Sequence, residues 1–165
     1  MNKNKLSLIA DNSGNGIEFH HFNPDIFGSL ADSMNRFTIG TMFRIMLPDI
    51  MPDLKKIIYL DSDLFVNTDI EELWNLNIDN YCLAAAQDCS TIRNWGTPYA
   101  VAAGQTTRDR YFNAGVLCMN LDNIRKNGSL FQQVMDYLND NPRTWLPDQD
   151  ALNSIFSGET LLRQL

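Results

Sequence analysis

Alternating apolar and polar stretches along the chain predict strands separated by helices. The clearest strand lies in the run Lys56–Val66, an apolar stretch that ends in two aspartates one residue apart, Asp61 and Asp63. Further strands are expected at residues 17–22, 82–86, 115–121 and 160–165. Because helical segments lie between most of these runs, the pattern predicts an α/β sheet covered by helices on both faces.

Helices are expected at residues 6–10, 38–47, 69–74, 122–139 and 149–156. Pro48 is expected to end the second of these helices, since proline lacks the backbone donor that a helix interior needs. Gly128 is expected to interrupt the long fourth segment, and Ser129 to restart it. Asp122 and Asp148 precede apolar runs and are expected to be helix N-caps.

Asp61 and Asp63 are spaced so that an extended backbone would direct both carboxylates to the same side. Carboxylate oxygens are the ligands that Mg²⁺ and Mn²⁺ prefer, and both ions commonly carry phosphates. The pair therefore indicates half of a metal and diphosphate site. Two alternatives remain open: an Asx turn at the strand end, and a calcium loop, although Phe65 and Val66 stand where such a loop needs an oxygen ligand and a glycine.

Composition narrows the class of protein. With 165 residues and 44% hydrophobic residues, the chain has enough apolar material for a core, and we expect a single domain over residues 1–165. The net charge of −7 and scattered basic residues argue against a nucleic-acid partner. Cys82, Cys89 and Cys118 are expected to be reduced thiols of a cytoplasmic protein. With no apolar stretch of about 18 residues, neither secretion nor membrane spanning is indicated, which leaves peripheral contact with the inner membrane open.

Residues 90–110 form a long segment rich in polar residues, glycine and proline. Loops of this length in compact domains are usually functional. We expect either a lid that binds an acceptor or a tolerated surface insertion.

Four motifs follow one another in the chain: Thr41–Arg44, Asp61–Asp63, Tyr111–Val116 and Leu146–Asn153. In this order and spacing they resemble glycosyltransferase family 8, the retaining nucleotide-sugar transferases that include glycogenin and bacterial galactosyl- and glucosyltransferases. The resemblance implies a GT-A-like fold with a Rossmann-type mixed sheet flanked by helices. It implies Mn²⁺-dependent (or Mg²⁺-dependent) transfer of glucose or galactose from a UDP-sugar to a saccharide or lipid-linked glycan.

The resemblance also implies roles for individual residues. The metal ligands would be Asp61 and Asp63; the substrate-binding residues would be Arg44, Ser62, Asp88, Asn113, Ala114 and Gly115; the catalytic residues would be Asp148 and Gln149. Asp148 would hold sugar hydroxyls, and Gln149 would lie beside the anomeric carbon. Because a neutral amide is a poor nucleophile, a front-face mechanism is favoured over a covalent glycosyl-enzyme.

The chain departs from the family pattern in two places. We find no Ala-Asp-Asp-Asn-Tyr-like segment for the uridine, and His20 and His21 lie in the wrong place to supply a third metal ligand. We therefore expect a domain truncated at both ends, without the first nucleotide-binding strand, impaired in activity and with an exposed sheet edge. The alternatives are a non-catalytic remnant that binds sugar or a partner chain, with dimerisation through that edge, and a marginally folded fragment.

Overall fold

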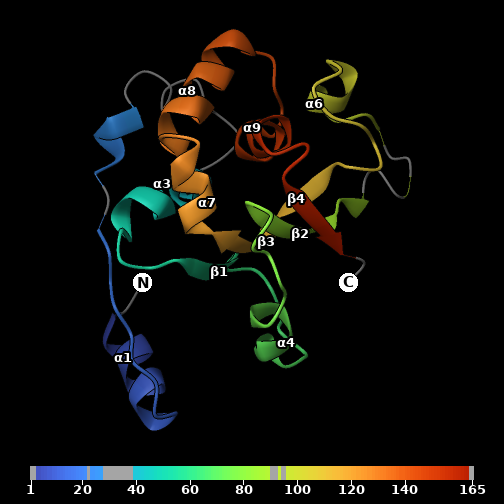
Figure 1. The fold of residues 1–165 in the computed structure, drawn as a ribbon. Coiled ribbons are helices and arrows are strands. Elements are labelled where there is room, and N and C mark those ends of the chain that lie inside the picture. Colours follow the sequence, from blue (N-terminus) through green and yellow to red (C-terminus); the bar gives the residue numbers. More distant parts are fainter. Residues whose placement is uncertain (1–2, 22, 28–38, 90–92, 94–95, 164–165) are drawn as a thin grey trace. The chain divides into compact units, whose positions relative to one another are not determined.

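The computed structural model describes residues 3–21, 23–27, 39–89, 93 and 96–163. The chain forms two compact units, Met1–Ile39 and Gly40–Leu165 (Figure 1). The first unit contains helix α1 (Lys3–Asn12) and the 3₁₀ helix η1 (Pro24–Phe27). The strand expected at residues 17–22 is wrong: residues 17–21 have no regular structure, and Phe22 lies outside the described residues.

The second unit is built on a mixed four-stranded sheet. Its strands are β1 (Lys56–Leu60), β2 (Leu83–Gln87), β3 (Phe112–Asn120) and β4 (Thr160–Arg163), in the order β1-β3-β2-β4. Strand β3 runs antiparallel to both β1 and β2, whereas β4 runs parallel to β2. The start of β3 therefore lies beside the carboxyl ends of β1 and β2, which brings together two of the predicted motifs, Asp61–Asp63 and Tyr111–Val116, and Asp88.

The pairing of β2 with β3 is irregular beside this end of the sheet. Ala85 pairs with Leu117 and Gln87 pairs with Phe112, so residues 113–116 of β3 lie opposite Ala86 alone. A bulge of this kind removes backbone groups from the ladder and leaves them to other partners.

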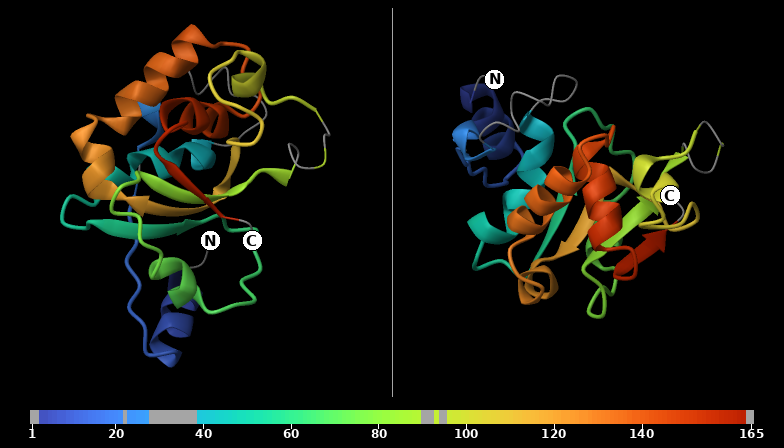
Figure 2. Two further views of the ribbon diagram at one scale, coloured as in Figure 1. Left: turned by 45° about the vertical axis from the view of Figure 1, so that its right-hand side comes forward. Right: turned by 90° about the horizontal axis from the view of Figure 1, so that it is seen from above.

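Helices cover the two faces of the sheet unequally (Figures 1 and 2). The helices are η2 (Ile39–Met42), α3 (Phe43–Ile50), α4 (Ile70–Trp74), α6 (Tyr99–Ala102), α7 (Leu121–Lys126), α8 (Leu130–Asp140) and α9 (Pro147–Ile155). Helices α3, α7, α8 and α9 lie over one face, where α9 contacts β3, α8 and α6. Helix α4 lies on the other face and contacts β1.

The helix boundaries correct two expectations and confirm two. Helix α3 continues through Pro48 to Ile50. Asn120, not Asp122, caps α7: its side chain accepts a hydrogen bond from the backbone N–H of Asn123 at 3.0 Å. The break at Gly128 is confirmed, because α7 ends before it, its φ of 97° suits glycine, and Ser129 caps α8.

The apolar core lies between the sheet and the helices α3, α7, α8 and α9 that cover one of its faces. Its fully buried side chains include Ile45, Leu117, Met119, Leu121, Ile124, Leu130, Val134, Leu152 and Phe156. Cys82 and Cys118 are unpaired and buried as expected, whereas Cys89 is unpaired but exposed. Burial and a hydrogen bond to Glu159 raise the pKa of Cys82 to about 12. Among the described residues, no helix is both long and apolar enough to span a bilayer.

Candidate functional site

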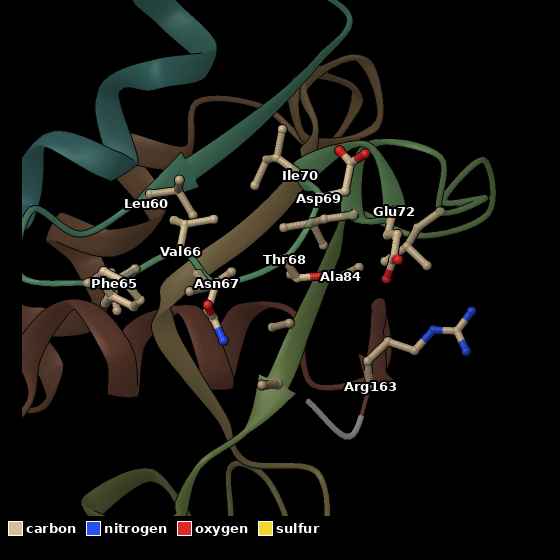
Figure 3. Close-up of a pocket in the computed structure, with 16 residues that line it drawn as sticks. Leu60, Phe65, Val66, Asn67, Thr68, Asp69, Ile70, Glu72, Ala84 and Arg163 are labelled. Atoms are coloured by element: carbon tan, nitrogen blue, oxygen red, sulfur yellow. The ribbon is translucent and has the colours of Figure 1, made fainter.

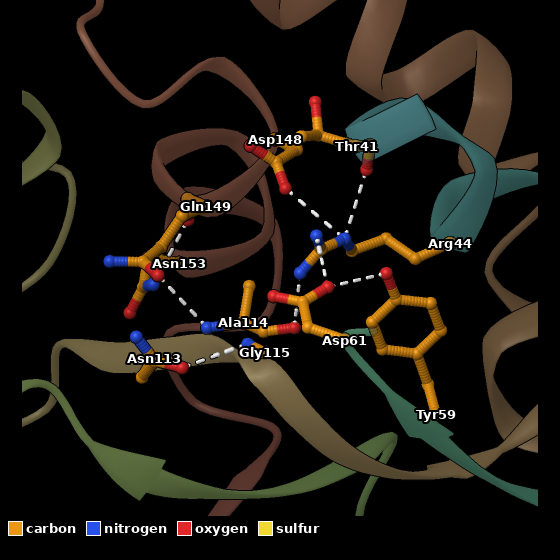
Figure 4. Close-up of polar contacts among 10 residues, drawn as sticks. All are labelled: Thr41, Arg44, Tyr59, Asp61, Asn113, Ala114, Gly115, Asp148, Gln149 and Asn153. Atoms are coloured by element: carbon orange, nitrogen blue, oxygen red, sulfur yellow. Dashed lines mark hydrogen bonds and ion pairs between the residues drawn. The ribbon is translucent and has the colours of Figure 1, made fainter. Parts of the chain in front are cut away.

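Arg44 lies at the centre of a polar cluster where β1 ends, β3 begins and α9 starts (Figure 4). The residue is only 4% exposed. Its guanidinium donates to Oδ1 of Asp61 at 2.8 Å and lies 3.2 Å from Oδ2 of Asp148. It also donates to the backbone carbonyls of Thr41, at 2.9 Å, and Ala114. A planar guanidinium suits this role, because its donors point in fixed directions to several acceptors at once.

Asp61 is held from its own strand as well as by Arg44. The hydroxyl of Tyr59, two residues earlier, donates to Oδ1 of Asp61 at 2.6 Å. The ring of Tyr59 lies under the guanidinium of Arg44, with 4.6 Å from Cζ to the ring centroid. Burial, followed by the hydrogen bond to Asp61, raises the pKa of Tyr59 above its ordinary value, so the hydroxyl remains a donor.

Gly115 allows the Asp61 carboxylate to approach β3 closely. A Cβ at this position would lie 2.8 Å from Oδ2 of Asp61 and 3.0 Å from Oδ1 of Asn113. The backbone N–H of Gly115 donates to that Asn113 oxygen at 2.8 Å, and its carbonyl accepts from the N–H of Asp61 at 2.8 Å. Only glycine leaves room for both side chains.

Asp148 is a buried carboxylate on the first turn of α9. The helix begins at Pro147 with Leu146 as its N-cap residue, so the expected N-cap role of Asp148 is wrong. Proline is well suited to the first helical position, where its missing N–H costs nothing. Asp148 faces Arg44 instead; burial raises its pKa, although the Arg44 charge acts in the opposite direction.

The side-chain amide of Gln149 is fixed at both ends. Its Oε1 accepts from the backbone N–H of Ala114 at 2.9 Å, and its Nε2 donates to Oδ2 of Asp88 at 3.1 Å and to the hydroxyl of Tyr111 at 3.3 Å. Asn113 donates to the same Asp88 oxygen at 3.3 Å. Gln149, Asn113 and Asp88 therefore form one connected group.

The sequence reasoning gave no role to four buried or half-buried polar residues in this region, although three of them lie in the motifs: Tyr59, Tyr111, Asp150 and Asn153. Asp150 is 1% exposed and accepts from the hydroxyls of Tyr111, at 2.9 Å, and Thr144, at 2.6 Å. Asn153 exchanges two 2.8 Å hydrogen bonds with the backbone of Phe112. The spacing of Gln149 and Asn153, four residues apart on one helix face, was an available signal for the latter.

Asp63 and Ser62 are placed differently from the expectation. Strand β1 ends at Leu60, and Ser62 and Asp63 lie in an exposed turn, so the extended backbone expected through Asp63 is wrong. Within the described ranges, His, Cys, Asp and Glu side chains nowhere gather in threes as a metal-binding group. A calcium loop needs such a cluster of carboxylates, so this finding also argues against the calcium-loop alternative. The roles of Asp61 and Asp63 as metal ligands stay a prediction.

A separate cavity of about 530 Å³ lies against the face of the sheet that carries α4 (Figure 3). Its walls are mainly apolar and come from the end of β1, the segment 64–69, α4 and the three alanines of β2. Phe65, at its edge, is 88% exposed. The polar residues around it include Asp69, Glu72 and Arg163.

Comparison with known proteins gives the family of this chain. The model of glycosyl transferase family 8 matches residues 2–162, and the chain belongs to this family. General stress protein A of Bacillus subtilis is 30% identical over 159 residues, which are 93% of this chain and 53% of that protein. A putative glycosyltransferase of Haemophilus influenzae is 34% identical over 81% of this chain and 40% of its own length.

The fold agrees with the family. A crystal structure of the galactosyltransferase LgtC, in complex with donor and acceptor sugar analogs, superposes with a TM-score of 0.81 at 26% identity. The match covers 98% of this chain and 59% of LgtC. The GT-A-like mixed sheet and the family resemblance are thus confirmed. The chain spans about half the length of the relatives that it matches.

Proposed function

We propose that this chain is the catalytic part of a retaining hexosyltransferase that moves glucose or galactose from a UDP-sugar to a saccharide or glycolipid acceptor. The main support is the contact of Arg44 with both Asp61 and Asp148. One buried guanidinium thereby joins three of the four sequence motifs at one end of the sheet, and its carbonyl partner Ala114 belongs to the fourth. Membership of family 8 supports the same activity.

The residues present fit a divalent cation, Mn²⁺ or Mg²⁺. Asp61 uses Oδ1 for Arg44 and Tyr59, its Oδ2 is turned towards Gly115, and its side chain is 31% exposed. The carboxylate of Asp63 is exposed and close in sequence, and the backbone of Ser62 would face the nucleotide. When bound, the cation would neutralise charge on the diphosphate as UDP departs.

The remaining site residues would bind and orient the donor sugar. Asp148 would accept hydrogen bonds from sugar hydroxyls, with Arg44 balancing its charge. Asp88 and Asn113 would do the same from the carboxyl end of β2 and the start of β3. Gly115 would keep Asp61 and Asn113 in place beside the donor, because only glycine leaves room for both of their oxygens.

Gln149 would lie at the reacting face of the sugar. Its amide is neutral and is fixed between Ala114 and Asp88, so it is suited to stabilising positive charge on the sugar rather than to forming a covalent bond. We therefore favour a front-face mechanism, in which the leaving phosphate accepts the proton of the acceptor hydroxyl. A glycosyl adduct trapped on Asp148 would contradict this mechanism.

Residues 96–110 are proposed as part of the acceptor side. Residues 90–92 and 94–95 of the predicted lid lie outside the described residues, and the described part contains the short helix α6. The N–H of Ala100 in α6 donates to Asp150, next to Gln149 in the chain, at 3.2 Å. For a lipid-linked acceptor we place the enzyme in the cytoplasm, at the periphery of the inner membrane.

The test is calorimetric binding of UDP-glucose and UDP-galactose to the chain with and without Mn²⁺, followed by detection of released UDP. We expect Mn²⁺-dependent binding that Asp63→Ala abolishes. The matched control is Asp53→Ala, which removes another exposed aspartate from a turn. A folded chain that binds neither donor in the presence of Mn²⁺ would overturn the proposal.

A second candidate function is a non-catalytic module that binds sugar or another chain. It is supported by β1, which lies at an edge of the described sheet and pairs with β3 alone there. An open edge can pair with a second copy or with a partner strand. Under this alternative, sedimentation shows a dimer and UDP-sugars are not turned over.

A further inference from the structure

Tyr59 is the residue of the Arg44 cluster whose contacts suggest a role that the sequence motifs do not. It precedes Asp61 by two positions. The backbone at Asp61 still pairs with β3, because the N–H of Asp61 donates to the carbonyl of Gly115 just beyond the end of β1. Residues two apart on an extended backbone point to the same side. The side chains of Tyr59 and Asp61 consequently meet above the same edge of the sheet (Figure 4).

The two oxygens of the Asp61 carboxylate have different surroundings. Oδ1 accepts from Tyr59 at 2.6 Å and from Arg44 at 2.8 Å. Oδ2 lies on the side of Gly115, where a methyl group would come within 2.8 Å of it. Two donors on one oxygen fix the rotation of the carboxyl group and turn the other oxygen, which neither donor engages, towards Gly115, while the side chain stays 31% exposed.

We propose that Tyr59 is a positioning residue of the metal and diphosphate site, holding Asp61 so that Oδ2 is the oxygen presented to the cation. This inference rests on the proposed function, since it concerns the same cation. Tyr59 acts through Asp61 and contacts neither donor nor metal itself. Residues that hydrogen-bond to a metal-ligating side chain commonly contribute about 10- to 100-fold to metal affinity.

Arg44 alone is a weaker constraint on Asp61, because its guanidinium is shared with Asp148 and two carbonyls. The Tyr59 hydroxyl has one acceptor in the cluster, Oδ1 of Asp61, at a length typical of a charge-assisted bond. Removing the hydroxyl would let the carboxylate turn towards Arg44 with either oxygen. The cation would then meet a ligand of variable orientation.

The substitution Tyr59→Phe isolates this effect, because the ring that lies 4.6 Å from Arg44 is kept while the hydroxyl is lost. The matched control is Tyr81→Phe. Tyr81 is also half-buried, but it packs against the cluster of Ile78, Ala84 and Cys118. Both variants lose one hydroxyl and keep one ring.

The experiment measures Mn²⁺ affinity in the presence of saturating UDP, from the electron paramagnetic resonance signal of unbound aqueous Mn²⁺. We expect Tyr59→Phe to weaken Mn²⁺ binding about 10- to 100-fold, and Tyr81→Phe to leave it within about twofold of the unsubstituted chain. Equal affinities in the unsubstituted chain and Tyr59→Phe would overturn the role of Tyr59 while leaving the proposed function intact. Absence of Mn²⁺–UDP binding by the unsubstituted chain would overturn both.

A second measurement covers the case in which Tyr59→Phe does not fold, as judged by circular dichroism. A 3-fluorotyrosine installed at position 59 gives a single ¹⁹F resonance beside the carboxylate. Mn²⁺ with UDP should broaden this resonance strongly, and Mg²⁺ with UDP should shift it without broadening. A resonance that responds to neither would exclude a cation on Asp61.

Discussion

The amide of Gln149 and the carboxylate of Asp88 lie 3.1 Å apart, although 61 positions separate them in the sequence. The pair requires a donor on one side and an acceptor on the other. Because Oε1 of Gln149 accepts from the N–H of Ala114, the amide cannot reverse without losing both contacts. Its orientation is therefore fixed by two neighbours of opposite hydrogen-bonding character.

Gln149→Glu should destabilise the fold by about 1–3 kcal/mol at pH 8, since a carboxylate oxygen would replace the amide donor opposite Asp88. Repulsion raises the folded-state pKa of the introduced acid above its unfolded value, so stability is lost as pH rises through and above the unfolded value. Urea unfolding at pH 5 and pH 8 measures this, with Gln132→Glu as the control, because Gln132 is exposed and its amide also donates to an aspartate, Asp136. A loss that is no larger at pH 8 than at pH 5 would contradict the prediction.

Gly115→Ala should weaken Mn²⁺–UDP binding by more than about tenfold, because the added methyl group would displace the Asp61 carboxylate that lies 2.8 Å from it. Strain of this kind also lowers the free energy of unfolding by about 1–3 kcal/mol. The matched control is Gly158→Ala, where the new methyl group would meet nothing within 4 Å. Isothermal calorimetry measures binding, and urea unfolding measures stability. Binding by Gly115→Ala equal to that of the control would show that Asp61 is not constrained here.

Asp148 should make stability fall as pH rises from about 4 towards 7, relative to Asp148→Asn. Burial raises its folded-state pKa above the unfolded value, so the native chain retains a proton that the unfolded chain has lost. Urea unfolding of both chains across this range gives the difference. A difference of the opposite sign would show that the Arg44 charge outweighs burial and holds the pKa of Asp148 low.

Asn153→Ala should lower the free energy of unfolding by about 1–3 kcal/mol, because the N–H and carbonyl of Phe112 would lose their partner in the interior. Asn153 is fully buried, whereas Asn139 on α8 is exposed, so Asn139→Ala is the control. Chemical denaturation monitored by tryptophan fluorescence measures both. Equal effects of the two substitutions would mean that water replaces the lost contacts.

The regular elements could be predicted where a local pattern decides them. The apolar run that became β2 was identified to within one residue, the start of β1 at Lys56 was identified although its end at Leu60 was not, and Ser129 was recognised as the cap that restarts the helix. Residues 17–21 had a similar pattern but form no strand, because pairing depends on a neighbour that a local pattern does not reveal. Pro48 was expected to end α3, yet the helix continues for two residues beyond it, so the missing backbone donor does not by itself decide where this helix ends.

The sequence indicated which residues belong to the candidate site, but not the contacts between them. The family motifs pointed to Arg44, Asp61 and Asp148, but not to the ion pairs that join them. These contacts depend on tertiary structure, as the bond from Arg44 to Ala114, 70 positions away, illustrates. Tyr59 was missed for another reason: inside an apolar strand its hydroxyl gives no signal until its neighbours in space are known.

The mismatch between β2 and β3 has a consequence for how the site tolerates change. With four residues, 113–116, opposite one, the N–H and carbonyl of Ala114 serve Gln149 and Arg44 instead of a neighbouring strand. Shortening this stretch to match its neighbour would restore a continuous ladder and withdraw those groups from the site. The number of residues between Phe112 and Leu117 is therefore expected to be under as strong a constraint as their chemical identity.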